Sequence, residues 1–348
     1  MFTKSVGIIF VIISLYSCAH KISYKRIEKE ENLSSLVFTG YGRYSYTRGN
    51  IETYLEELKL LNLNTASFLY SCQTKTLYSS NVDCSSNYTP SLNSIKMAIE
   101  MAKQRGFRVS LRHYIDVENK KWRCYWDPED KELAFENIQN QLSVFAELLE
   151  EYKVENFIIG AEYCQLSNSS YELYWREIIS KVREKFKGRV SYGANWEAVN
   201  NVNEFFETPI WKYVDELGLD MYFPIPNTIK KKEIYTYQER MLKKYIQHAK
   251  KFKKPLIINE IGYPGSKKGT LEPYEWRNMT PGPELRQAMA YRYTLLALKS
   301  DKTVRGIYLW RKLAANKYEM NTYNPNETDY NLWKRKAWYE VQSFFNNY

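Results

Sequence analysis

FIIGAEY, residues 157–163, is an apolar run that ends in a carboxylate, and PLIINEIGY, residues 255–263, repeats the pattern. Continuous β-branched and aliphatic runs between polar segments are typical of strands in a sheet that is covered on both faces. Each run carries one glutamate near its C-terminal end, Glu162 and Glu260. In a parallel barrel the carboxyl ends of the strands meet at one face, so we expect the two carboxyl groups to lie together there.

Outward from these two runs, strand patterns and helix patterns alternate along the chain. Strand patterns occur at residues 36–44, 64–70, 108–114, 157–163, 189–196, 216–223, 255–263 and 306–310. Helix patterns occur at residues 50–63, 92–104, 131–152, 171–187, 233–252, 284–299 and 332–345. This rhythm predicts an α/β fold, a single-domain (β/α)8 TIM barrel over residues 36–348. A doubly wound open sheet is the alternative, but neither a GxGxxG nor a Walker sequence is present.

Local signals mark where several of these helices begin and end. Asn50 is predicted to cap the first helix, because its side chain can accept a hydrogen bond from a free N–H of the first turn. Gly106 and Gly188 follow the second and fourth helices and are predicted to end them.

Composition and charge narrow the class of function. Aromatic residues make up 16% of the chain, with 31 Tyr and 9 Trp, which suits a carbohydrate site where flat rings stack on sugars, although ordinary core tyrosines are the alternative. The formal charge of +10 comes from Lys and Arg on amphipathic segments such as residues 243–254, not from one basic arm. We therefore predict a solvated basic surface and no nucleic-acid partner. Attraction to anionic polymers or lipid headgroups is the less favoured interpretation.

The first residues are typical of a targeting segment. Lys4 precedes an apolar stretch, residues 6–15, that is too short to span a bilayer. The following LYSC, residues 15–18, resembles a bacterial lipobox, which predicts a signal peptide at residues 1–17, a lipidated Cys18 and a polar tether at residues 18–35. A plain secretory signal is the alternative. We expect an exported protein that is anchored through lipid alone to a bacterial membrane, the outer membrane if the cell is Gram-negative, and that faces the periplasm or the cell exterior.

The remaining cysteines predict disulfides rather than a metal site. They are Cys72, Cys84, Cys124 and Cys164. An even number in an exported protein allows three connectivities. Pairing Cys72 with Cys84 and Cys124 with Cys164 is favoured, because it would fasten loops on the same face of the barrel. No CxxC is present and the three histidines are not spaced as ligand pairs, so no metal site is predicted, and no cofactor is indicated.

Several motifs in a fixed order resemble glycoside hydrolase family 113 over about residues 36–345. They are FIIGAEY, Trp175, Arg183, VSYGANWE (190–197), LGLDMYFP (217–224) and KPLIINEIGYPG (254–265). The resemblance implies a retaining, β-mannanase-type enzyme whose acid/base follows strand four and whose nucleophile follows strand seven. Glu162 then corresponds to the acid/base and Glu260 to the nucleophile. A retaining mechanism requires their carboxyl groups to be about 5 to 5.5 Å apart.

The same resemblance implies further residues near the substrate. Tyr222 would hold the nucleophile in position, with core packing as the alternative role, and Trp310, at the end of strand eight, would form the floor of a sugar subsite. Asn195 and Trp196 match an ANW motif of the family. Trp122 and Arg123 match a WR pair in the loop after strand three.

Other residues near strand three leave the choice of sugar open. Arg112 and Asp116 would either bond sugar hydroxyls or pair with each other. Ala161 stands where the family more often has Thr, and His113–Tyr114 replaces an expected Pro-His pair. These departures concern sugar specificity more than hydrolysis.

We therefore expect a monomeric, lipid-anchored, retaining endo-β-glycosidase that cleaves a β-linked polysaccharide or oligosaccharide, with mannan as the first candidate. A non-catalytic carbohydrate-binding lipoprotein is one alternative, which the presence of both glutamates disfavours. The other is an enzyme acting on an amino-sugar or acidic polysaccharide of the cell envelope, which a basic surface would suit.

Overall fold

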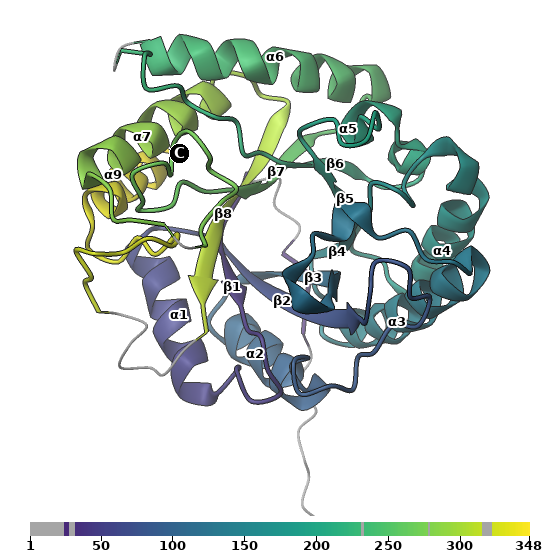
Figure 1. Cartoon of the computed structure of the whole chain (residues 1–348). Coiled ribbons are helices and arrows are strands. Elements are labelled where there is room, and N and C mark those ends of the chain that lie inside the picture. The colour runs from purple at the N-terminus through teal and green to yellow at the C-terminus, as the bar shows by residue number, and fades with distance from the viewer. Residues whose placement is uncertain (1–23, 28–31, 231–232, 278, 315–321) are drawn as a thin grey trace, which may run out of the picture.

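The apolar runs form eight parallel strands that close into a barrel in the computed structural model (Figure 1). Neighbouring strands pair in chain order, and the last pairs with the first. The strands are β1 Leu33–Thr39, β2 Thr65–Thr74, β3 Arg108–Val117, β4 Asn156–Ala161, β5 Arg189–Asn195, β6 Glu216–Asp220, β7 Leu256–Ile261 and β8 Val304–Leu313. The structure describes residues 24–27, 32–230, 233–277, 279–314 and 322–348. The predicted (β/α)8 TIM barrel is confirmed.

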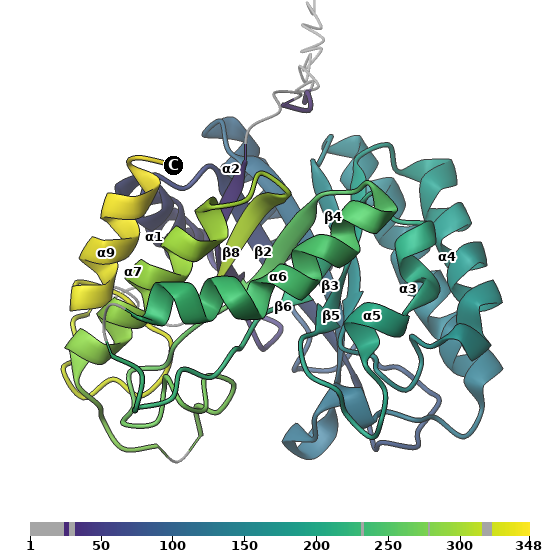
Figure 2. The same ribbon diagram turned by 90° about the horizontal axis from the view of Figure 1, so that it is seen from above.

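Helices surround the barrel and bury their apolar faces against its outer wall (Figures 1 and 2). They are α1 Arg48–Leu60, α2 Leu92–Gln104, α3 Lys131–Glu151, α4 Glu172–Lys185, α5 Glu204–Glu207, α6 Ile234–Phe252, α7 Glu284–Lys299 and α9 Lys336–Phe345. Phe38, Phe68 and Phe157 belong to the core between strands and helices, whereas Leu69 and Ile257 belong to a smaller cluster inside the barrel. Two apolar layers separated by the strand wall are what this fold requires.

Several predicted boundaries are wrong. β1 begins at Leu33, so the last residues of the predicted tether are part of the barrel. Thr47, not Asn50, caps α1, and Asn50 completes a reciprocal capping box by accepting from the Thr47 N–H at 2.9 Å. β8 continues to Leu313, so Trp310 does not end it. The last helix starts at Lys336 rather than residue 332.

The two ends of the barrel differ in their loops. Long loops follow the strands at the C-terminal end, where the strands finish, and short loops precede the strands at the N-terminal end (Figure 2). Residues 24–27 lie against the N-terminal end, where Arg26 Nε donates to the Val154 carbonyl at 3.0 Å and the Ile27 N–H to Glu155 Oε1 at 2.9 Å. The predicted signal peptide and Cys18 lie outside the described residues. None of the helices among the described residues combines the length and the apolar character that a membrane span requires.

Candidate active site

Glu162 and Glu260 both lie at the C-terminal end of the barrel. Glu162 directly follows β4, and its N–H donates to the Gly193 carbonyl at 2.8 Å. Its φ of 55° lies in the left-handed region, which residues with side chains enter at a cost of about 1 to 3 kcal/mol. Glu260 lies within β7, opposite Asp220 of β6. Both glutamates are largely buried, with 8% and 4% of their surfaces exposed.

Two tyrosines hold the Glu260 carboxylate. The Tyr114 hydroxyl donates to Oε1 and the Tyr222 hydroxyl to Oε2, both at 2.7 Å. The guanidinium of Arg112 lies 3.8 Å from Oε1. Donors on both oxygens fix the orientation of the carboxylate and stabilise its negative charge.

Arg112 is fully buried beneath this carboxylate. It donates to Ser67 Oγ at 3.0 Å and to the Tyr114 hydroxyl at 3.1 Å, and it lies over the Tyr308 ring. It forms no pair with Asp116, contrary to one of the two expectations. The guanidinium therefore contacts Tyr114 and Glu260 and is shielded from solvent.

Glu162 has a different environment. Trp122 Nε1 donates to its Oε2 at 2.7 Å, and the Arg123 guanidinium is 4.0 Å from the same oxygen. Burial raises the pKa of Glu162 to about 7; the charge of Arg123 opposes this rise, that of Glu260 adds to it, and the Trp122 bond opposes it. A substantial fraction of Glu162 is therefore protonated at neutral pH, as a general acid must be.

Asp116 links the loops around Glu162. It accepts hydrogen bonds from Arg123 Nη1 at 3.1 Å, from the Tyr88 hydroxyl at 3.0 Å and from Ser71 Oγ at 2.5 Å. These three bonds all come from neighbouring side chains. The bond from Arg123 holds its guanidinium beside Glu162.

The two predicted disulfides are confirmed, and one of them supports the site. Cys124 is bonded to Cys164, and Cys72 to Cys84. Cys124 lies in the short turn that carries Trp122 and Arg123, and Cys164 lies two residues after Glu162. The bond therefore fastens both side chains that contact Glu162 to the segment that presents it.

The remaining sequence-predicted residues surround the glutamates at the same end. Trp122 is 36% exposed and is the most accessible of the aromatic candidates. Trp310 is mostly buried and belongs to the same apolar cluster as Tyr222, with Trp196 packed against its edge. Asn195 is buried, and its amide donates to the Glu197 carbonyl at 2.8 Å. Exposed and half-buried indoles beside carboxyl groups offer flat surfaces to a sugar ring.

Sequence reasoning missed Asp220 and Asn259, and it named Tyr114 only as a departure from the family pattern, without its bond to Glu260. Asp220 is fully buried and accepts a hydrogen bond from Asn259 Nδ2 at 2.8 Å. Burial raises the pKa of Asp220 well above its usual range, and the charges of Glu260 and Glu162 act in the same direction. Gly193 leaves room for this pair, because a Cβ there would lie 2.3 Å from Asn259 Nδ2. An aspartate inside the apolar run LGLD was the available signal.

Glu204 is a second missed carboxylate, on the four-residue helix α5. It accepts hydrogen bonds from Ser167 Oγ at 2.8 Å and from the Tyr192 hydroxyl and the Asn195 N–H at 2.7 Å. Burial raises its pKa to about 7. These bonds join the segment after Glu162 to the end of β5 and give Glu204 a structural role.

Among the described residues, one group of potential metal ligands lies close together, namely Cys72, Cys84 and His113. The disulfide between the cysteines occupies both sulfur atoms, so neither is a free thiolate. Burial lowers the pKa of His113 to about 4, so the ring is neutral beside the disulfide. This group is therefore part of the packed wall in the oxidised protein.

Comparisons with known proteins agree with this architecture. The family model described as Glycoside Hydrolase Family 113 matches residues 37–335. A β-1,4-mannanase of that family has a solved structure with a TM-score of 0.78 at 21% identity, covering 91% of this chain and 100% of its own. The β-mannanase AaManA from Alicyclobacillus acidocaldarius has a TM-score of 0.77 at 18% identity, covering 91% of this chain and 98% of its own. A β-glucuronidase from an uncultured Clostridium shares the fold at a TM-score of 0.61 and 15% identity, covering 91% of this chain and 51% of its own. A comparison with curated protein sequences gave no match.

Proposed function

The chain belongs to glycoside hydrolase family 113, and we propose that it hydrolyses a β-linked, mannan-like polysaccharide with retention of anomeric configuration. Glu260 is the nucleophile and Glu162 the general acid/base in this proposal. The observation that carries it is the contrast between the two glutamates: phenols hold both oxygens of Glu260, whereas burial raises the pKa of Glu162 to about 7. One carboxylate is therefore oriented to attack, and the other retains a proton to donate.

In the first step Glu260 attacks the anomeric carbon while Glu162 gives its proton to the departing glycosidic oxygen. The bond from the sugar to this oxygen breaks, and an ester bond to Glu260 forms. Tyr114 and Tyr222 keep the attacking carboxylate in place up to this point.

In the second step a water molecule replaces the ester. Glu260 loses its charge on becoming an ester, so its contribution to the raised pKa of Glu162 disappears. The water attacks the anomeric carbon, and Glu162, now ionised, takes a proton from this water. The ester bond breaks, the carboxylate of Glu260 is restored, and the sugar retains its configuration.

Proton NMR of early hydrolysis tests the mechanism. The β-anomer should appear first from a β-linked substrate, before mutarotation mixes the products. Initial release of the α-anomer would mean that a water lies between carboxyl groups about 6.5 to 9.5 Å apart, as in inverting enzymes, and Glu260 would lose the role of nucleophile.

Mannan is proposed as the substrate class because the related mannanases share the fold over nearly the whole chain. Digestion of β-mannans, β-glucans and acidic exopolysaccharides by the chain from Ala19 onward, with products identified by mass, tests this assignment. Products from mannan alone would support it, and products from an acidic polymer alone would replace it with the envelope-polysaccharide alternative.

We also propose export and lipid anchoring at Cys18. The two disulfides favour an oxidising compartment, in accord with an exported protein. Cys18→Ala should move the protein from the membrane fraction to the soluble fraction after cell disruption. Continued sedimentation of this variant with membranes would refute lipidation at that residue.

A further inference from the structure

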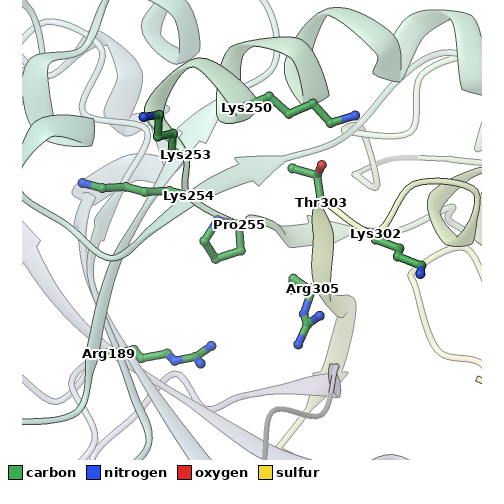
Figure 3. Close-up of a pocket in the computed structure, with 8 residues that line it drawn as sticks. All are labelled: Arg189, Lys250, Lys253, Lys254, Pro255, Lys302, Thr303 and Arg305. Atoms are coloured by element: carbon green, nitrogen blue, oxygen red, sulfur yellow. The ribbon is translucent and has the colours of Figure 1, made fainter.

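The N-terminal end of the barrel, opposite the two glutamates, carries a pocket of about 530 Å³ (Figure 3). Every charged side chain that lines it is a cation. The lining residues are Arg189, Lys250, Lys253, Lys254, Pro255, Lys302, Thr303 and Arg305. We call this set of residues the basic pocket.

The basic pocket is built around the starts of β5, β7 and β8, with Lys250 contributed by the last turn of α6. Arg189 begins β5, Lys253 and Lys254 separate α6 from β7, and Lys302 lies between α7 and β8. In Figure 3 the arginines lie below Pro255, and the lysines extend outward on either side of it. The cations thus spread over the surface of this end instead of converging on one point.

Nearby carboxylates neutralise only part of this charge. Arg189 pairs with the buried Glu216 at 2.9 Å, and Lys250 pairs with Asp301 at 2.7 Å. Lys254 donates to the carbonyls of Trp211 and Val214, and the carboxylate that acts on its charge, Asp215, is shared with Arg183.

Two exposed lysines of the pocket have no such partner. For Lys253 and Lys302, no side-chain ion pair is found within the described ranges. The surface therefore keeps net positive charge after its ion pairs are taken into account.

Complementing helix C-termini accounts for only part of this charge. Lys and Arg favour the last helical turn because they offset its partial negative charge, and the effect fades within one turn. Lys250 lies in the last turn of α6 and Lys253 caps it, whereas Lys302 and Arg305 lie beyond the end of α7. Over residues 185–189, 250–255 and 299–305 the only acidic residue is Asp301. A run of one sign at this density indicates a partner of the opposite sign.

We propose that the N-terminal end of the barrel docks on the anionic headgroups of a membrane surface, with the glutamates facing away from the membrane. A membrane presents many phosphates in a plane, which matches cations distributed around the starts of three strands better than a single soluble anion does. This inference concerns binding and stands independently of the proposed hydrolysis.

The course of the chain before the barrel supports this orientation. Residues 24–27 lie at the same end (Figure 2). Lys103 Nζ donates to the Lys25 carbonyl at 3.1 Å. The chain between Cys18 and Tyr24 extends at most about 20 Å. The lipid proposed at Cys18 would therefore hold this end, and not the opposite one, near the bilayer.

Flotation with lipid vesicles tests the proposal with the chain from Ala19 onward, which contains all the described structure. Vesicles of phosphatidylcholine with about 30% phosphatidylglycerol are compared with pure phosphatidylcholine. Lys253→Glu/Lys302→Glu is the test variant, and Lys75→Glu/Lys267→Glu, on exposed loops at the opposite end, matches its change in net charge. Each basic residue at an anionic surface contributes about fivefold to partitioning, so the test variant should bind the anionic vesicles at least about 25-fold more weakly.

The control variant should remain within about twofold of the original chain, and salt at about 0.5 M should abolish binding of both. Circular dichroism checks folding, and Lys253→Gln/Lys302→Gln replaces the test variant if charge reversal disturbs it. Equal binding to both kinds of vesicle, or equal losses in the test and control variants, would overturn the proposal. Tighter, lysine-dependent binding to soluble polygalacturonate than to vesicles would also overturn it and would assign this end to an acidic polysaccharide.

Discussion

The two ends of the barrel differ in the sign and the burial of their charged side chains. At the C-terminal end three carboxyl groups, those of Glu162, Asp220 and Glu260, are buried near one another, and the pKa values of the first two are raised. At the N-terminal end the basic pocket exposes its charges to solvent or pairs them, as Arg189 pairs with Glu216. Buried groups of one sign raise the free energy of the folded state, whereas solvated cations cost little.

This difference separates the residues that perform chemistry from those that maintain the fold. Glu162 combines a left-handed backbone with a buried carboxyl group, and both features oppose folding. Each feature also occurs elsewhere among the described residues, but the two coincide at Glu162, where the proposed mechanism requires an acid. The four predictions below change residues at the C-terminal end, and three of them use a matched change elsewhere as the control.

The largest expected effect comes from Glu260→Ala, which should lower kcat/KM by at least about 10⁴-fold because no group remains to form the ester. Its control is Glu216→Ala, which removes a buried carboxylate at the opposite end. Glu216 accepts from Asn156 Nδ2 at 2.8 Å, so its loss should cost about 1 to 3 kcal/mol of unfolding free energy and leave the folded enzyme active. Steady-state kinetics and urea unfolding measure both effects. Loss of catalysis in both variants would remove the distinction between the ends.

The second prediction concerns the disulfide beside Glu162. Cys124→Ser/Cys164→Ser should lower the unfolding free energy by about 3 kcal/mol, because the bond closes a long loop. It should also lower kcat/KM, since Trp122 and Arg123 are no longer fastened beside Glu162. Cys72→Ser/Cys84→Ser should cost similar stability with a smaller loss of activity. Equal losses of activity in the two variants would mean that the bond acts on stability alone.

Much of the fold was accessible from the sequence, because the apolar runs that predict strands are local. FIIGAEY and PLIINEIGY gave two strand positions to within a few residues, and the barrel rule then placed Glu162 and Glu260 at one end. The hydrogen bonds of the site are not local. Tyr114 reaches Glu260 across the barrel interior, and its sequence context, HY within a strand, does not show which way its hydroxyl points.

Backbone geometry and short elements were also out of reach. No local signal marks Glu162 as left-handed, since neither Gly nor Asn occupies the position. Helix α5 is four residues long, too short for a helical period to appear, so Glu204 was missed. The start of β1 was misplaced because Leu33–Ser34–Ser35 is less apolar than the run that follows it.

The third prediction tests whether burial of the Glu162 carboxyl group lowers the unfolding free energy as pH rises. Its folded pKa of about 7 exceeds its ordinary value of 4.5, so its favourable contribution is complete below about pH 4.5 and is lost as pH rises through 7. Glu162→Gln has no such dependence and still offers an oxygen to Trp122. Relative to the original chain, this variant should gain about 3 kcal/mol of unfolding free energy between pH 4.5 and 8. Urea unfolding across this range measures the gain, and a constant difference would contradict the raised pKa.

The smallest effect is the pH dependence of kcat/KM, which reports the protonation of Glu162 during catalysis. If Glu162 must be protonated to release the leaving group, kcat/KM falls as pH rises through about 7 and then drops about tenfold for each further pH unit. Trp122→Phe removes a hydrogen bond that lowers the pKa of Glu162, so the falling limb should move to higher pH whatever happens to KM. Glu216→Gln, at the opposite end, should leave the limb in place. If the falling limb of the kcat/KM profile stays at the same pH in Trp122→Phe, a group other than Glu162 supplies the proton.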